Sequence, residues 1–266
     1  MKIAICGKGG SGKSTLTVLL AKVFSNKGYK VLVIDADESN SGLHRKLGFK
    51  KAPIPILETV GGRQAIKDKN NRKLLVGGTL VNNNILDNSM IHISDLSEIN
   101  LARHDNIALV QIGKINQALE GCACPMGMLN REFLDKLILE QDEIAIVDTE
   151  AGLEHFGRGM DAAIDSILII VDPSSESVDF AQRAYILSKS INIKNIWVSL
   201  NKIPSNDVAA KLKDKLLKKG ISVTLSIPLD QLIFKAELNG KPVNKTVSWE
   251  NINYFVDIIL QSRNEG

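Results

Sequence analysis

A glycine-rich loop near the N-terminus constrains the fold more than any other feature of this sequence. It reads Gly7-Lys8-Gly9-Gly10-Ser11-Gly12-Lys13-Ser14 and fits the pattern G-x-x-x-x-G-K-[ST] at every defined position. An apolar strand pattern (2–6) precedes the loop, and a helical pattern (14–26) follows it. The glycines let backbone N–H groups turn toward an anion, and the helix N-terminus adds a positive dipole. We therefore expect the loop to bind nucleotide phosphates.

Side chains of this loop have expected roles in phosphate chemistry. We place the phosphate-binding stretch at Gly7 to Thr15. Lys13 would reach the β- and γ-phosphates, and the Ser14 hydroxyl would bind Mg²⁺. A chance glycine turn between a strand and a helix is the alternative, and the complete motif in the right context argues against it.

Short apolar runs alternate with amphipathic patterns along the rest of the chain. They predict strands at 2–6, 30–35, 107–112, 143–148, 166–171, 195–200 and 222–227, and helices at 14–26, 127–140, 175–190, 206–219 and 247–262. Most of the strand patterns are almost continuously apolar, which is typical of parallel strands buried on both faces. We expect an α/β fold: a single P-loop NTPase domain over 1–266, with a mainly parallel twisted sheet flanked by helices on both faces. The stretch 40–106 reads as an irregular, insertion-like region of that domain.

Composition limits the classes of function. The chain has 33 Lys and Arg against 30 Asp and Glu, a balance too small and too dispersed for an electrostatic nucleic-acid binder. No stretch approaches the 18 apolar residues of a membrane span, and Met1 is followed so closely by the glycine loop that no room is left for a signal peptide. We expect a soluble, cytoplasmic protein with neither a nucleic-acid nor a membrane partner.

Acidic residues follow two of the predicted strands, at the edge where doubly wound sheets bind their ligands. Asp35 and Asp37 lie at the end of the second strand, although they could instead cap the next turn. Asp148 ends the fourth strand, where a carboxylate can hold Mg²⁺ through water. Gly152 follows it and could offer its N–H to the γ-phosphate, a contact that hydrolysis would release.

Cys122 and Cys124 form a C-x-C pair just before a predicted helix. Thiols at i and i+2 can point the same way from an extended backbone, and Pro125 suits the first turn of a helix whose N-terminus favours thiolates. One pair supplies two soft ligands, whereas a thiolate site for Zn²⁺ usually has four, so facing pairs in a two-fold dimer would complete it. From the residues alone, a metal site, a redox pair and incidental cysteines all stay open. The third cysteine, Cys6, is expected to be a small buried strand residue.

Lys8, the lysine of the loop that the general phosphate-loop pattern does not require, indicates a resemblance to a known family. Gly-Lys-Gly-Gly resembles the deviant Walker A ATPases, which include the nitrogenase iron protein, Min-type and plasmid-partition ATPases, and metallocentre-maturation ATPases. The resemblance implies an ATPase that converts ATP and water to ADP and phosphate, with two nucleotides held between two subunits. Lys8 of each subunit would reach the other's phosphates and share catalysis with Lys13. A solvated loop lysine is the alternative reading of Lys8.

The same resemblance assigns further nucleotide contacts. Asp37 would lie in switch I and orient the attacking water, and Asp35 would help to hold the Mg²⁺ shell. Adenine would lie near two strand ends, at Asn201-Lys202 and Pro228-Leu229-Asp230. Asn201 and Asp230 could equally be turn formers.

Within this family the chain resembles the CooC-type nickel-insertion ATPases of carbon monoxide dehydrogenase and their acetyl-CoA synthase relatives. The likeness spans the phosphate loop, switch I, the cysteine pair and Asp172-Pro173-Ser174, and its most discriminating piece is Glu150-Ala151-Gly152-Leu153-Glu154-His155-Phe156-Gly157-Arg158-Gly159 in switch II. It implies ATP- and Mg²⁺-dependent delivery of Ni²⁺ to a nickel–iron–sulfur client by a homodimer that depends on nucleotide and metal. Zn²⁺ could occupy the same Cys122 and Cys124 site. His155 could be an auxiliary ligand or a surface or capping histidine, whereas His92 and His104 have no ligand spacing and read as loop residues.

Two rival functions within the family predict other features. Electron transfer, as in the nitrogenase iron protein, would need two well-separated cysteines per subunit for a [4Fe–4S] cluster, and Cys6 lies in a predicted strand. A partition or positioning ATPase would act by dimerising on DNA or membrane. Its membrane versions would need a basic amphipathic tail, whereas 247–262 carries a core-type apolar stripe with little basic charge. Neither rival accounts for the cysteine pair.

Overall fold

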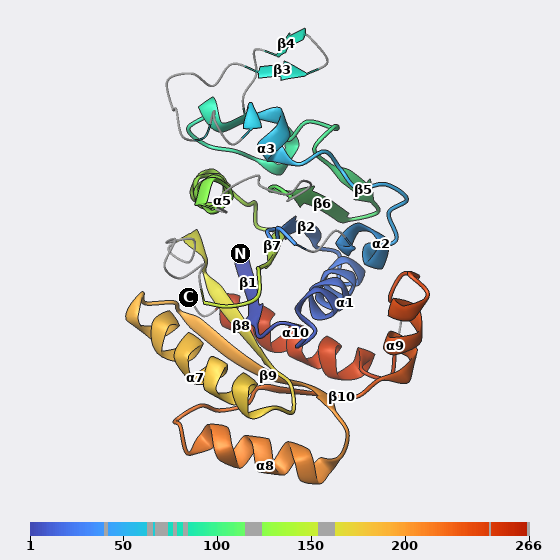
Figure 1. Ribbon diagram of the computed structural model, residues 1–266, viewed down its shortest axis with the longest axis vertical. Helices are drawn as coiled ribbons and strands as arrows, with labels where there is room; N and C mark the ends of the chain where they lie inside the picture. Colours follow the sequence, from blue (N-terminus) through green and yellow to red (C-terminus); the bar gives the residue numbers. More distant parts are fainter. Residues whose placement is uncertain are drawn as a thin grey trace.

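The computed structural model describes residues 1–39, 42–62, 66, 74–76, 79–81, 85–114, 124–153, 163–244 and 246–264. An eight-stranded sheet with the order β10-β9-β8-β1-β7-β2-β6-β5 runs through the molecule (Figure 1). Its strands are β1 (Lys2–Gly7), β2 (Lys30–Asp35), β5 (Ala102–His104), β6 (Ile107–Gln111), β7 (Glu143–Asp148), β8 (Ser166–Val171), β9 (Asn195–Ile203) and β10 (Leu225–Pro228). All pairings are parallel except that of the edge strand β5 with β6. β3 (Leu74–Val76) and β4 (Thr79–Val81) pair antiparallel as a separate two-stranded sheet.

Helices cover both faces of the sheet, as the sequence predicts. They are α1 (Lys13–Asn26), α2 (Leu43–Leu47), α3 (Ile56–Thr59), α5 (Cys124–Lys136), α7 (Ser175–Ser190), α8 (Asn206–Leu217), α9 (Gln231–Leu238) and α10 (Trp249–Asn264), with 3₁₀ turns η1 (Ile85–Asp87) and η2 (Ile93–Asp95). α5, α7 and α8 pack on one face and α1 and α10 on the other, so each face has its own apolar core. Alternate residues of β1 serve the two cores: Ala4 and Cys6 face the first, Ile3 and Ile5 the second.

Each predicted strand and helix is present, and the bounds of several need correction: β9 extends to Ile203, α8 ends at Leu217, and α10 spans Trp249–Asn264. The predicted helix 127–140 is α5, which begins at Cys124 and ends at Lys136. It ends early because Leu137 forms a parallel bridge with Ile91, and the Ile138 N–H then donates to the Ile91 carbonyl at 2.8 Å. The predicted strand 222–227 is β10, which begins only at Leu225.

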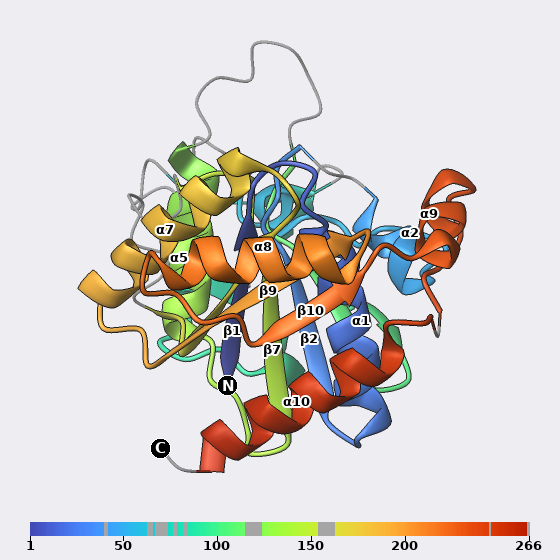
Figure 2. The ribbon, with the colours of Figure 1, turned by 90° about the horizontal axis from the view of Figure 1, so that it is seen from below.

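The described parts of 40–106 form short elements, and several of their apolar residues are buried in the two cores of the sheet. Leu43 of α2 is buried in the core beneath α1, whereas Ile56 of α3 and Ile91 are buried in the core around α5. β5 extends the sheet as an antiparallel edge strand that the sequence analysis did not predict. α9, also not predicted, lies beside α2 at the margin of the molecule (Figures 1 and 2).

The sheet positions the polar residues that the sequence singled out. Because β1, β2, β6, β7, β8, β9 and β10 are parallel, their carboxyl ends lie along one edge of the sheet. The phosphate loop, Asp35, Asp148 and Asn201 each lie at or just beyond one of these ends. Doubly wound sheets bind ligands at this edge. Among the described residues, no helix is both long and apolar enough to span a membrane.

Candidate nucleotide-binding site

The phosphate loop has a backbone conformation that its glycines make accessible. Gly10 and Gly12 have φ angles of 77° and 102°, in the left-handed region that L side chains rarely adopt. Gly12 is also the N-cap of α1, and a Cβ added there would lie 2.3 Å from Asn201 Nδ2. The loop is closed by a hydrogen bond from the Ser11 N–H to the Lys8 carbonyl at 3.1 Å. Both glycines are therefore required by the shape of the loop.

Asn201 and Lys202, at the end of β9, support this loop directly. The Asn201 amide donates to the Ser11 carbonyl, and the Lys202 ammonium donates to the Gly10 carbonyl, each at 2.8 Å. Lys202 itself has a φ of 58°, so its backbone turns sharply at that point. The structure thus places both residues against the phosphate loop, and their predicted contact with adenine stays a prediction.

The two loop lysines point in different directions. Lys13 is buried, and its ammonium donates to the Gly7 and Lys8 carbonyls at 3.2 and 3.4 Å, inside the loop. Lys8 reaches outward to the N-terminus of α7, with Ser174 Oγ at 3.4 Å and Glu176 Oε2 at 3.7 Å. Its side chain is 39% exposed, so its charge is accessible at the molecular surface. Only Lys13 is held where a bound phosphate would meet it within this chain.

Asp148 has the features expected of a carboxylate that holds a cation. It is fully buried, and within the described residues its Oδ2 atom has no hydrogen-bond partner. Burial raises its pKa to about 7 from an ordinary 3.8; Asp35 and Asp37 add to this shift, and a hydrogen bond from Ser14 and the charge of Lys13 oppose it. Mg²⁺ prefers hard oxygen ligands, so the Asp148 carboxylate and the Ser14 hydroxyl fit it well. A Mg²⁺ held by these two residues would neutralise negative charge on the nucleotide phosphates.

The raised pKa of Asp148 predicts how stability depends on pH without Mg²⁺. A carboxyl with a raised native pKa stabilises the fold below pH 4, and this contribution is lost as pH rises to about 7. The loss amounts to about 4 kcal/mol at most. Asp148→Asn lacks the ionising group, so urea unfolding in a metal chelator should show it to be increasingly more stable than wild type between pH 4 and 7.

Asp142 supplies the matched control for that experiment. It precedes the same strand, but it is exposed and paired with Lys30 at 2.9 Å. Asp142→Asn should differ from wild type in stability by a constant amount between pH 4 and 7. If the difference between Asp148→Asn and wild type also stayed constant over this range, the buried Asp148 carboxyl would not contribute to the pH dependence.

The segment predicted to be switch I is held by Gln111 and Lys114, two residues that were not predicted as site residues. Asp35 is buried and accepts from Lys114 Nζ at 2.8 Å and from Gln111 Nε2 at 3.0 Å. Burial raises the pKa of Asp35, and Lys114 and Gln111 counteract that shift. The Asp37 Oδ1 accepts from both the N–H and the hydroxyl of Ser39, at 2.9 and 2.7 Å, and so caps a turn. Asp37 therefore does cap a turn, as the alternative interpretation expected. Its catalytic role stays a prediction.

The sequence contained a pattern from which two residues of this network, Gln111 and Lys114, could have been predicted. Gln111 and Lys114 follow the apolar pattern of β6 just as Asp35 and Asp37 follow β2, so strand-end reasoning could have included them. Their pairing with Asp35 depends on the adjacency of β6 and β2 in the sheet. That adjacency is not readable from either strand alone.

A second missed cluster lies at the start of α1. The Thr15 hydroxyl donates to the Glu237 carboxylate of α9, and Lys46 of α2 donates to the same oxygen at 2.7 Å. Burial by itself would raise the pKa of Glu237, but the bonds from Lys46 and Thr15 outweigh it and lower that pKa. This cluster brings α2 and α9 to the phosphate loop.

The predicted adenine segment at the end of β10 forms the start of α9. Asp230 is the N-cap of α9: its Oδ1 accepts from the Leu232 N–H at 2.8 Å and its Oδ2 from the Val247 N–H at 3.1 Å. Pro228 ends β10 and is exposed. Within this chain Asp230 therefore caps a helix, in line with the turn-forming alternative. The adenine contacts of this segment stay predictions.

Switch II begins beside the phosphate loop. The Thr149 hydroxyl donates to the Ile5 carbonyl of β1 at 2.8 Å. A Cβ added at Gly9 would lie 3.7 Å from the Ala151 Cβ, and Gly152 has a φ of 113°. The rest of the discriminating segment, including His155, lies outside the described residues.

The cysteine pair is described in part. Cys124 is the first residue of α5 and Pro125 the second, which agrees with the expectation that Pro125 occupies the first helical turn. Cys122 and the side chain of Cys124 lie outside the described residues. Cys6 is buried in β1, as expected. Among the described residues, no group of three or more His, Cys, Asp and Glu side chains could hold a metal ion.

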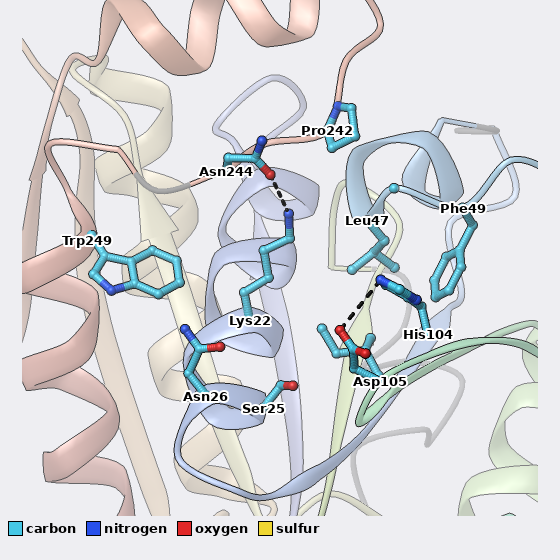
Figure 3. A pocket seen from close by; sticks show the side chains of 12 residues that line it. Lys22, Ser25, Asn26, Leu47, Phe49, His104, Asp105, Pro242, Asn244 and Trp249 are labelled. Carbon is cyan, nitrogen blue, oxygen red and sulfur yellow. Dashed lines mark hydrogen bonds and ion pairs between the residues drawn. The ribbon is translucent and has the colours of Figure 1, made fainter.

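A cavity of about 500 Å³ lies at the other end of α1 from the phosphate loop (Figure 3). Lys22 donates across it to Asn244 at 3.3 Å, and His104 approaches Asp105 at 3.5 Å on its far wall. His104 ends β5 and is thus not the loop residue that was predicted, whereas His92 lies in a loop and caps η2. None of the residues that line this cavity belongs to the phosphate loop.

The phosphate loop between β1 and α1, on a mainly parallel sheet, defines a P-loop ATPase. The chain belongs to the CobQ/CobB/MinD/ParA nucleotide-binding domain family, whose model matches residues 2–243.

The relatives within this family include several ATP-binding proteins. An uncharacterised ATP-binding protein of Methanocaldococcus jannaschii is 43% identical, over 98% of this chain and all of the relative. The carbon monoxide dehydrogenase accessory protein CooC of Rhodospirillum rubrum is 32% identical, over 90% of this chain and 88% of CooC. The solved structure of the cell division ATPase MinD of Pyrococcus furiosus has the same fold, with a TM-score of 0.67 at 16% identity and 98% coverage of both chains.

Proposed function

We propose that this chain is a homodimeric maturation ATPase that carries a divalent metal ion, nickel in the physiological case, to a nickel–iron–sulfur enzyme. The client would be carbon monoxide dehydrogenase or acetyl-CoA synthase. The observation that carries the proposal is the position of Cys124, the second cysteine of the C-x-C pair, at the start of α5 in a chain 32% identical to CooC. The metal ion is the cargo of this reaction, and ATP hydrolysis drives its delivery.

The location of α5 supports the choice of the cysteine pair as the cargo site. α5 follows β6 and leads back to the start of β7, so its N-terminus lies at the carboxyl edge, as the phosphate loop does. The free N–H groups and dipole of a helix N-terminus favour thiolates, the metal-binding form of cysteine. A metal held there would lie at the edge of the sheet where ATP is bound.

The number of thiols supports a dimer. Cys122 and Cys124 supply two ligands, and soft divalent ions in thiolate sites commonly have four. A two-fold axis repeats the same patch on both subunits, so facing pairs complete the shell without further ligands. The outward direction and accessible charge of Lys8 support a contact with the nucleotide of a second subunit.

The similarity to MinD raises a positioning ATPase as an alternative, but the apolar face of α10 is not exposed as that of a membrane-binding helix would be. Ile252, Phe255, Val256 and Ile259 are all fully buried, and Phe255 packs edge-to-face on Trp197 of β9 with ring centroids 5.7 Å apart. This helix is therefore part of the core, as its apolar stripe predicts. The fold shared with MinD does not account for the cysteine pair.

The proposed site is tested by Cys122→Ser, Cys124→Ser. We expect this double variant to lose Ni²⁺ and Zn²⁺ binding while it retains ATP binding, because serine hydroxyls are poor ligands for soft ions. Metal titration of the reduced protein should give one ion per dimer in the wild type. With Zn²⁺, X-ray absorption should show four sulfurs at about 2.3 Å.

Cys6→Ala is the matched control, since Cys6 is buried in β1 and should take no part in metal binding. This control should keep the wild-type stoichiometry. One metal per monomer in the reduced wild type, unaffected by dilution to monomer, would contradict the shared site.

A further inference from the structure

Lys114 forms a buried bridge to both aspartates of switch I. Its ammonium donates to Asp35 Oδ1 at 2.8 Å and also to the backbone carbonyl of Asp37. The side chain of Lys114 is 8% exposed and that of Asp35 is 1% exposed. A buried ion pair of this kind is hard to separate, because either partner left alone would be an uncompensated charge in the interior.

The backbone beside Lys114 is packed against the first turn of the cysteine-bearing helix. A Cβ added at Gly113 would lie 2.7 Å from the Met126 sulfur, so the two residues are in close contact. Met126 is buried and follows Cys124 by two residues in α5. Close-packed contacts transmit a displacement rather than absorb it, since no void is available to take it up.

The same segment is fixed to β2 from its other side. The Ile112 N–H donates to the Asp35 carbonyl at 3.0 Å, and the Ile112 carbonyl accepts from the Leu57 N–H at 2.9 Å. Residues 112–114 therefore connect switch I to the start of α5 through an unbroken series of contacts. Every residue of this series is described.

We propose that Lys114 is a positioning residue that couples the nucleotide state of switch I to the N-terminus of α5, and hence to the cysteine pair. A shift of the Asp37 backbone weakens the bond from Lys114 to its carbonyl. Lys114 stays with Asp35, because separating this buried pair would leave an uncompensated charge in the interior. The displacement of Lys114 moves Gly113 against Met126, and the first residues of α5 move with Met126. The inference rests on the proposed function only in its choice of the cysteine pair as the responding site.

The test measures thiol reactivity in two nucleotide states. In a Cys6→Ala background, the rate of modification of Cys122 and Cys124 by a disulfide reagent is compared with ADP and with a non-hydrolysable ATP analogue. We expect the wild-type rates to differ by about 5-fold or more, the usual size of allosteric coupling. Lys114→Met should bind both nucleotides, yet its two rates should differ by less than about 2-fold. A merely structural lysine would change both rates and keep their ratio.

Lys136→Met is the matched control. Lys136 ends the same helix and makes the same kinds of contact, with the Glu132 carboxylate at 3.0 Å and with the Leu86 carbonyl. This control should keep the wild-type ratio of rates. Lys114→Arg retains the charge, so its modification rates with the two nucleotides should differ by nearly as much as those of the wild type.

Asp35→Asn, Lys114→Met removes both buried charges together and gives a second test if Lys114→Met alone does not fold. In this double variant, too, the modification rates with the two nucleotides should differ by less than about 2-fold. A wild-type ratio in either folded Lys114→Met variant would overturn the coupling role, and so would identical rates for the two nucleotides in the wild type. A wild type that binds no metal would instead contradict the proposed function, and it would leave the thiol measurement interpretable.

Discussion

Lys13→Ala should lose most of its nucleotide binding, with an affinity for ATP reduced by about 30-fold or more. Removing one partner of a desolvated charge pair costs about 2–5 kcal/mol, and Lys13 is the buried cation held inside the phosphate loop. Isothermal titration with ATP and Mg²⁺ measures the loss directly. Lys22→Ala, a change on the same helix but nine residues on, is the control and should bind ATP normally.

Lys8→Ala should behave differently, because its ammonium points out of the loop toward Glu176 and the surface. We expect this variant to bind ATP but to lose nucleotide-driven dimerisation. Light scattering with and without ATP separates the two variants. An unchanged dimer in Lys8→Ala would rule out a role for Lys8 across the subunit interface.

Asp37→Asn should bind ATP and hydrolyse it about 100-fold more slowly or worse. A positioned general base contributes about 10²–10⁴-fold, and asparagine removes the charge that would orient the attacking water. Asparagine keeps an Oδ1 atom that can still accept from Ser39, so the turn of switch I should survive. Steady-state phosphate release at saturating ATP gives the ratio of turnover rates.

Ser39→Ala is the control for Asp37→Asn. It removes one of the two bonds to Asp37 Oδ1 and leaves the carboxylate in place, so turnover should fall by much less. Near-normal hydrolysis in Asp37→Asn would move the catalytic assignment to another residue. A loss of ATP binding would instead assign Asp37 to the nucleotide or its metal.

The sequence determined those parts of the protein that depend on neighbouring residues. The phosphate loop is a local motif, and Gly10 and Gly12 adopt the left-handed angles that such a loop requires. The apolar runs predicted the central strands, because a strand buried on both faces must be apolar along its length. Placing Asp35 and Asp148 at one edge followed from parallel strands alone.

Tertiary structure decided the features that depend on residues far apart in the chain. The Asn201 amide bonds to Ser11 and Thr15 bonds to Glu237 across 190 and 222 residues, and no local pattern carries such pairings. α5 stops at Lys136 because Leu137 pairs with Ile91, although helical periodicity continues past that point. Lys114 reads as an ordinary loop lysine until β6 is placed beside β2, where its ammonium pairs with the buried Asp35 carboxyl. Local propensity sets which elements form, whereas the desolvation of buried charges and the pairing of distant segments set which side chains meet.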